Sequence, residues 1–297
     1  MDDVLRPAFA LAVLLTAQSA SAFCRTSTDP NFVPTSARPC DDKHLPLFWA
    51  SKCVGYSVNR SASAQVPLAT AQKLVAEAFA EWAKHDCAEG GATCNGPGKP
   101  SLVAQDLGPV DCAAVEHTQG GANANIIAFR DGVWPHEGTA LALTTVTFKV
   151  DSGEIYDVDM EVQSNPTDVK LGIVDPLKAG EYDLRSILTH EAGHFLGLAH
   201  SLAAGNQATM FQSYRAGETF MRDLSADDIC GLCTANPPKR EATCDATPRG
   251  GLTPKCGGVA ADSGCGCGVP GAGADDAWIG VAGVAFILAR RRLRTRR

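Results

Sequence analysis

Two histidines and a glutamate in the middle of the chain have the spacing of a metal site. His190 and His194 are four residues apart, and Glu191 directly follows the first of them. Residues four apart lie on one face of an α-helix, one turn above each other, so both rings are expected to point at one place. Gly197 adopts positive φ without steric cost, so the chain can turn there and bring His200 to the same place.

These residue types predict zinc-dependent hydrolysis. Three neutral imidazoles with one open position form the ligand set of a catalytic zinc, whereas a structural zinc takes a fourth protein ligand. Zinc lowers the pKa of its bound water from about 16 to about 7 and polarises a carbonyl. We therefore expect His190, His194 and His200 to bind one Zn²⁺ and Glu191 to act as the general base. The alternative is a helix whose histidines meet by accident.

The stretch from His190 to His200 resembles the extended zinc signature of the metzincin metalloproteases, and in particular the matrixins. By this resemblance, the stretch around Met210 is a Met-turn, an apolar support beneath the metal. The resemblance also implies that Tyr214 borders the substrate pocket, although the usual proline of that segment is replaced by Gln212. The two further residues assigned to the pocket lie on the edge strand expected beside the cleft: Leu141 and Ala142.

The elements that position these residues follow from hydrophobic patterns. Apolar residues recur at helical spacing from Leu184 to Leu188, before the first histidine, and from Thr70 to His85, where Thr70 is a candidate N-cap. Four stretches have strand character after an initial strand near 54–58: 101–103, 125–129, 139–150 and 154–162. The last two flank a turn signal and should pair antiparallel. The stretch 139–145 resembles, in its position, the edge strand that binds extended substrate by strand addition in that family.

The resemblance implies an α/β (α+β) fold of the zincin type, with a twisted mixed sheet, an active-site helix and a C-terminal helix. Ser225 and Asp228 form a capping box at the start of this last helix. In the matrixins an acidic pair at this position, here Asp227 and Asp228, anchors the domain.

Three acids alternate along the stretch 154–162 and so share one face: Asp157, Asp159 and Glu161. A solvated face is the favoured interpretation, and a Ca²⁺ site is the alternative because calcium prefers oxygen ligands. The structural zinc of matrix metalloproteases is expected to be absent, because only His117 and His136 occur in this part of the chain and neither has ligand spacing.

The chain contains 12 cysteines, which favours an exported, disulfide-bonded protein. Cys40 resembles the cysteine switch of matrix metalloproteases only weakly, and an ordinary disulfide is the better interpretation, with Cys53 available nearby. Cys87 and Cys94 could close the loop between them. Cys230 and Cys233 have the spacing of half a zinc knuckle or a redox pair, but disulfides are favoured here too.

Composition divides the chain into five segments. An apolar run before Ala20-Ser21-Ala22 fits a signal peptide, and the end of the chain combines a cysteine motif, a short apolar run and six arginines. That order resembles the sorting tail of myxobacterial surface proteins. We expect a signal peptide, a lead segment, a catalytic domain, a Cys/Gly/Pro-rich linker and a sorting or anchoring tail, with these boundaries: 1–22, 23–45, 46–236, 237–275 and 276–297.

The net charge of −7, with six arginines gathered at the C-terminus, leaves an acidic body that argues against nucleic-acid binding. The sequence therefore predicts a monomeric endopeptidase at the cell surface or outside it, acting on protein or peptide substrates. Membrane contact is expected only through the tail. The alternative is an inactive protease fold that serves as an adhesion or binding module, and hydrolysis of small amides is a third interpretation.

Overall fold

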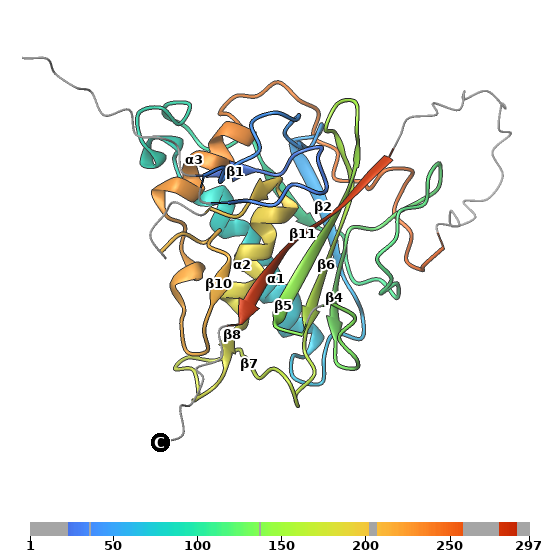
Figure 1. The fold of residues 1–297 in the computed structure, drawn as a ribbon. Helices are drawn as coiled ribbons and strands as arrows, with labels where there is room; N and C mark the ends of the chain where they lie inside the picture. Colours follow the sequence, from blue (N-terminus) through green and yellow to red (C-terminus); the bar gives the residue numbers. More distant parts are fainter. Residues whose placement is uncertain (1–22, 36, 137, 202–206, 258–278, 290–297) are drawn as a thin grey trace, which may run out of the picture.

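One twisted mixed sheet carries the helix of His190 and His194 on one face (Figure 1). The computed structural model describes residues 23–257 and 279–289, except 36, 137 and 202–206, and gives the backbone alone for 279–289. The strand order in the main sheet is β10-β11-β5-β6-β4-β2-β3. Its strands are β2 (Cys53–Val58), β3 (Val103–Asp106), β4 (Ile126–Arg130), β5 (Ala140–Lys149), β6 (Ile155–Gln163), β10 (Ser213–Tyr214) and β11 (Ile279–Ala289).

The central hairpin is the one predicted from the turn signal at 151–153. Strands β5 and β6 pair antiparallel, with Thr144 opposite Met160. Gly153 has φ of +79° in the turn, a conformation that favours glycine. The neighbours of β6 on the other side run parallel: β4 pairs with β6, and β2 pairs with β4 and β3. The predicted α/β fold class with a mixed sheet is therefore confirmed.

Two helices, α1 (Leu68–Lys84) and α2 (Leu184–Phe195), pack together on this sheet. The predicted cap at Thr70 is wrong: the helix begins after Pro67, whose ring already holds a helix-compatible φ of −58°. Phe79 of α1 stacks on Tyr56 of β2 and meets the edge of Phe195. The buried aromatic contacts hold α1, α2 and the sheet in one core.

Gly193 of α2 packs closely against Trp82 of α1. A Cβ there would lie 2.7 Å from the Trp82 ring and would also clash with the sulfur of Met210. We expect Gly193→Ala to lower the free energy of unfolding by about 1–3 kcal/mol, because the packed core has no room for a methyl group. Urea unfolding measures this. Gly132→Ala is the matched control, since nothing lies within 4 Å of a Cβ there. Equal stability of the two variants would contradict the prediction.

Helix α3 (Ala226–Ala235) is held by two disulfides to the loop after α1. The bonds are Cys87–Cys233 and Cys94–Cys230, so the expected closure of Cys87 on Cys94 is wrong. Both loop cysteines instead face α3, whose consecutive turns present Cys230 and Cys233 at helical spacing. The capping box of Ser225 and Asp228 at the start of α3 is confirmed.

The lead segment packs on the rest of the domain. Strand β1 (Cys24–Arg25) pairs antiparallel with β9 (Leu198–Ala199), directly after the helix that carries His190 and His194. Cys40 is bonded to Cys24 and not to Cys53, so its thiol is not free to act as a cysteine switch. Two further short strands, β7 (Leu171–Gly172) and β8 (Tyr182–Asp183), pair parallel with each other just before α2. Two 3₁₀ helices complete the elements: η1 (Cys87–Gly90) and η2 (Phe220–Arg222).

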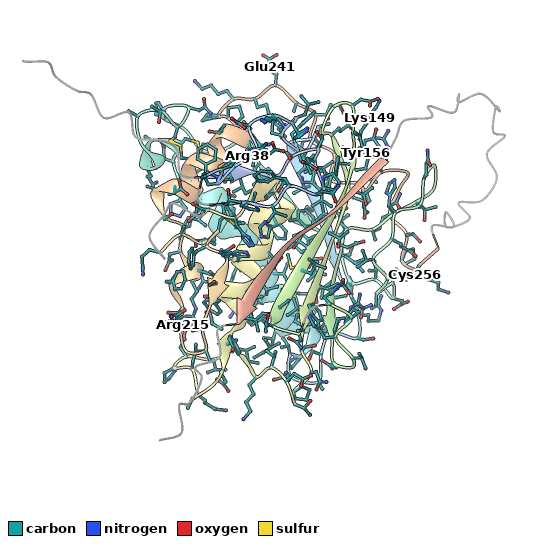
Figure 2. The ribbon with its side chains drawn as sticks, viewed as in Figure 1. Arg38, Lys149, Tyr156, Arg215, Glu241 and Cys256 are labelled. Atoms are coloured by element: carbon teal, nitrogen blue, oxygen red, sulfur yellow. A yellow bond between two sulfur atoms is a disulfide. The ribbon has the colours of Figure 1, made fainter. Side chains whose placement is uncertain are left out.

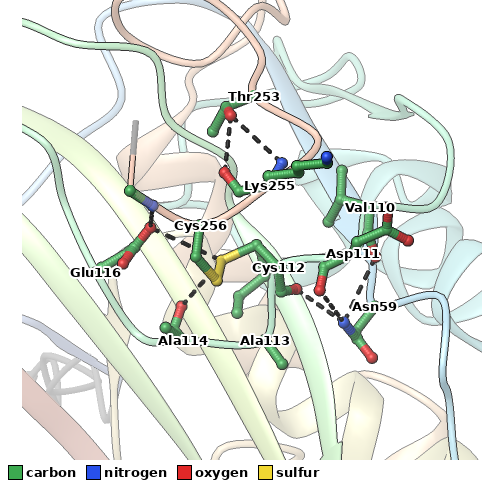
Figure 3. The surroundings of a disulfide bond; sticks show 12 residues. Asn59, Val110, Asp111, Cys112, Ala113, Ala114, Glu116, Thr253, Lys255 and Cys256 are labelled. Carbon is green, nitrogen blue, oxygen red and sulfur yellow. Dashed lines mark hydrogen bonds between the residues drawn. A yellow bond between two sulfur atoms is a disulfide. The ribbon is translucent and has the colours of Figure 1, made fainter. Parts of the chain in front are cut away.

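The first part of the segment expected to be a linker, residues 237–257, also lies on the domain. Cys53–Cys244 and Cys112–Cys256 bond it to the body, and Asn59 donates a hydrogen bond to the carbonyl of Cys112 (Figure 3). Arg249 lies 3.8 Å above the ring of Tyr156 on β6, a residue labelled in Figure 2. The disulfides therefore fix the chain up to Cys256.

The acidic face of β6 is buried, so the predicted solvated face is wrong. Asp157, Asp159 and Glu161 are 2%, 1% and 4% exposed. The amide of Glu116 lies against Asp159, and Arg130 and His136 pair with Glu161. Asp159 accepts hydrogen bonds from the amides of Glu116 and Ile126. Burial raises the pKa of Asp159 to about 8, and burial together with the charge of Asp159 raises the pKa of Asp157.

These raised pKa values predict that stability falls as pH rises. A carboxyl whose pKa is higher in the folded state binds a proton that the unfolded chain has already released, so stability is lost between about pH 4 and about pH 8. We expect Asp157→Asn to flatten this decline in urea unfolding at pH 5 and pH 8, with disulfides intact. Asp151→Asn in the exposed turn is the control. An identical pH dependence in parent and Asp157→Asn would refute the prediction.

Candidate active site

The zinc-binding helix predicted from the histidine spacing is α2, and its ends are fixed by polar contacts. Asp183 caps the first turn by accepting a hydrogen bond from the amide of Ser186 at 2.8 Å, and it forms an ion pair with Arg222. Helix α2 ends at Phe195. Gly197 follows with φ of +90°, next to the carbonyl of Leu47, so the predicted turn occurs at this residue.

The structure brings the three predicted histidines together. His190, His194 and His200 each offer a ring nitrogen, and these atoms lie within 4.8 Å of one another. The Nδ1 atoms of His190 and His194 lie 2.6 and 2.8 Å from the carbonyl oxygens of Thr209 and Leu198. A carbonyl only accepts hydrogen bonds, so these contacts place the proton on Nδ1 and leave both Nε2 atoms as lone-pair donors.

The unpaired nitrogens fit a shared cation. The Nε2 atoms of His190 and His194 are 3.0 Å apart, and with both protons on Nδ1 neither can donate to the other. Nε2 of His200 is buried and makes no hydrogen bond in the described part of the chain. Tetrahedral ligands 2.0–2.1 Å from a zinc lie roughly 3.3 Å apart, close to this spacing. Burial lowers the pKa of His190 to about 4 and shifts those of His194 and His200 well below the usual value, which keeps the rings neutral.

Glu191 is fully buried on α2, next to His190. Its Oε2 accepts a hydrogen bond from the hydroxyl of Thr144 on β5 at 2.6 Å, while Oε1 has no partner among the described residues. Burial raises the pKa of Glu191 to about 8, and the bond from Thr144 acts against this increase. One carboxylate oxygen is thus oriented by β5 and the other is left for a further ligand.

Met210 packs against α2, where a Cβ added at Gly193 would clash with its sulfur. The turn that carries it is held by Asp228 of α3, whose carboxylate accepts from the amides of Thr209 and Met210 at 2.8 and 3.0 Å. The carbonyl of Thr209 in turn faces His190. A chain of contacts therefore runs from α3 through the Met-containing turn to the first histidine, which is how a second layer of residues orients a metal ligand.

The three residues assigned to the substrate pocket lie in two places. Leu141 and Ala142 are buried in β5, and Tyr214 is buried in β10, where its hydroxyl donates to the carbonyl of Glu218. Leu141 lines a cavity of about 390 Å³ with residues that include Tyr182 and Val169. Within the described part of the chain, the lining of this cavity includes neither Ala142 nor Tyr214.

Residues 127–234 match the family model described as Matrixin. This region is matrixin-like. The match spans β4 to α3 and contains all three histidines, Glu191 and Met210, so it supports a zinc metallopeptidase domain. The acidic pair of α3 lies where the resemblance placed it, and Asp227 accepts a hydrogen bond from the hydroxyl of Ser201.

Other comparisons add little to the matrixin-like assignment. No curated protein matches the chain. Among solved structures, one described as "GM1 bound form of the ECX AB5 holotoxin" is similar with a TM-score of 0.32 and 12% identity, over 62% of this chain and 80% of that one. A likeness this weak says nothing about function.

Two residues of the matrixin-like site were not found from the sequence. Thr144 is one of several threonines in β5, and its contact with Glu191 joins residues 47 positions apart. Thr209 contributes only a backbone carbonyl, which any residue could supply. Neither position has a local pattern that separates it from its neighbours, so only the folded chain reveals their roles.

Proposed function

We propose that the chain is a zinc-dependent endopeptidase that hydrolyses extended protein substrates. The observation that carries this proposal is the convergence of three neutral imidazoles, those of His190 and His194 fully buried, with the Oε1 of Glu191, which has no partner among the described residues. A zinc bound by His190, His194 and His200 would polarise a peptide carbonyl and acidify a water. The residues of the chain itself would transfer the protons and align the substrate.

Glu191 supplies the proton transfers in this proposal. Its high pKa, caused by burial, makes it a base that accepts a proton and returns it to the leaving amine near neutral pH. Thr144 orients the carboxylate through Oε2, so that Oε1 carries the proton. Tyr214 and Leu141 are proposed to shape the side-chain pocket, and the edge of β5 to align the substrate backbone by strand addition.

Export is part of the proposal. Five disulfides are consistent with an extracellular protein, because such bonds persist in oxidising compartments. The expected signal peptide lies outside the described residues. None of the helices in the described ranges is long and apolar enough to span a bilayer. The proposed substrates are therefore proteins met outside the cell or at its surface.

Metal removal and return test the proposal. The purified chain should contain about one zinc and cleave an unfolded, reduced and alkylated protein. Chelation should abolish cleavage, because the three histidines then hold no ion, and added zinc should restore it. His194→Ala is expected to remove both the metal and the activity, while His85→Ala, at the end of α1 and outside the candidate metal clusters of the described residues, should change neither. Zinc binding without any cleavage would favour the inactive binding module instead.

A further inference from the structure

The expected edge strand β5 is paired on both sides. Strand β11 lies antiparallel along it from Ile279 opposite Lys149 to Leu288 opposite Ala140 (Figure 1). The other side of β11 pairs parallel with β10, where Ser213 lies opposite Leu288. Residues 279–289 therefore fill the slot beside β5, and β10 flanks them on the far side only at Leu288 and Ala289.

This slot lies next to helix α2. Val284 lies opposite Thr144, the residue whose hydroxyl is bonded to Glu191. Cα atoms of β11 and α2 approach within 8 Å. The pairing shifts register between Val284 and Phe286 and again before Leu288, so the ladder is irregular beside the Thr144 position.

The slot is also the surface that the proposed function assigns to substrate. One edge of one strand pairs with a single partner, so a substrate backbone and β11 exclude each other. Residues 279–289 contain no charged side chain, a composition suited to an extended strand between two others. The disulfide Cys112–Cys256 fixes the chain 23 residues before Ile279, and a tether of that length gives an effective concentration in the millimolar range.

We propose that residues 279–289 are a built-in competitor for the peptide-binding edge of β5, which holds the uncut chain latent. The inference rests on the proposed function for its consequence, since displacement of β11 must precede substrate binding. A competitor of this kind raises the KM for substrate and leaves kcat unchanged. The partner that the slot accepts is an extended, uncharged strand antiparallel to β5.

A cross-link tests the placement without any activity measurement. Thr145 and Gly283 lie opposite each other, so the double variant Thr145→Cys with Gly283→Cys should form a disulfide detectable by peptide mass spectrometry. Thr145→Cys with Ala282→Cys is the matched control, because a one-residue shift turns the side chain to the other face of the sheet. Equal cross-linking in both, or none in the first, would overturn the placement.

Deletion of residues 279–297 tests the consequence. The truncated chain is expected to show a KM for unfolded protein at least about tenfold lower with kcat changed less than twofold, and faster amide hydrogen exchange in β5. The full chain carrying Gly283→Pro and Val284→Pro should show the same lower KM. The amides of adjacent strand residues point alternately toward β5 and away from it, so the double change removes whichever donor faces β5.

The outcomes separate this inference from the function on which it rests. If the Thr145→Cys and Gly283→Cys pair cross-links and β5 is protected from exchange, but neither the full nor the truncated chain cleaves protein, the peptidase activity is refuted and the strand placement stands. Cleavage with the same KM in all variants would refute latency and keep the peptidase. If vesicles of phosphatidylcholine and phosphatidylglycerol protect 279–289 while β5 exchanges freely, the partner of the segment is a bilayer and the inference is overturned.

Discussion

Glu191→Gln is expected to lower kcat for peptide hydrolysis by about 10²- to 10⁴-fold while the zinc content stays at one per chain. Glutamine keeps the size of the side chain and the acceptor for the Thr144 hydroxyl. It removes the group that accepts a proton. The clustered ring nitrogens belong to His190, His194 and His200. Because Glu191 contributes no atom to this cluster, the metal site should remain intact. Initial rates and metal analysis of the same preparation check both halves of the prediction.

The matched control for this substitution is Glu241→Gln, at an exposed position labelled in Figure 2. It changes the net charge equally and should leave the rate unaltered. A Glu191→Gln chain that cleaves as fast as its parent would remove Glu191 from the mechanism. Loss of zinc along with activity would instead show that the carboxylate supports the metal site directly, which also contradicts the prediction.

Asp228→Asn should weaken zinc binding by about 10- to 100-fold and lower the free energy of unfolding by about 2–4 kcal/mol. The carboxylate of Asp228 is buried and accepts hydrogen bonds from the amides of Thr209, Met210 and Ser225. An asparagine nitrogen cannot accept, so at least one buried amide loses its partner. The turn that places the Thr209 carbonyl against His190 then loosens.

Zinc titration with a competing chelator and urea unfolding measure the two effects of Asp228→Asn. Asp223→Asn, at an exposed position before the same helix, is the control for loss of one negative charge. We expect it to change stability by less than about 0.5 kcal/mol. If Asp228→Asn destabilised the fold but bound zinc as tightly as the parent, the contact chain from α3 to the first histidine would have no role in metal binding.

The sequence by itself determined the elements whose signals are local. The spacing of His190 and His194 follows from the helix period, the turn at Gly197 from its freedom at positive φ, and the hairpin of β5 and β6 from three turn residues. Each needs only a few neighbouring residues. The matrixin resemblance extended this to Met210 and the acidic pair of α3: in the structure Met210 packs against α2 at Gly193, and Asp227 and Asp228 accept hydrogen bonds from Ser201 and Thr209.

Tertiary structure decided the features that join distant segments. Cys87 bonds to Cys233 and not to nearby Cys94, because α3 brings a partner across 146 residues. The acids of β6 are buried because groups distant in sequence, such as the Glu116 amide and the Arg130 side chain, pack against them; an alternating pattern records only that they share a face. The pairing of β11 with the edge of β5 was also decided by the tertiary structure. Any extended segment can form backbone hydrogen bonds, so the sequence predicts a strand but not which strand lies beside it.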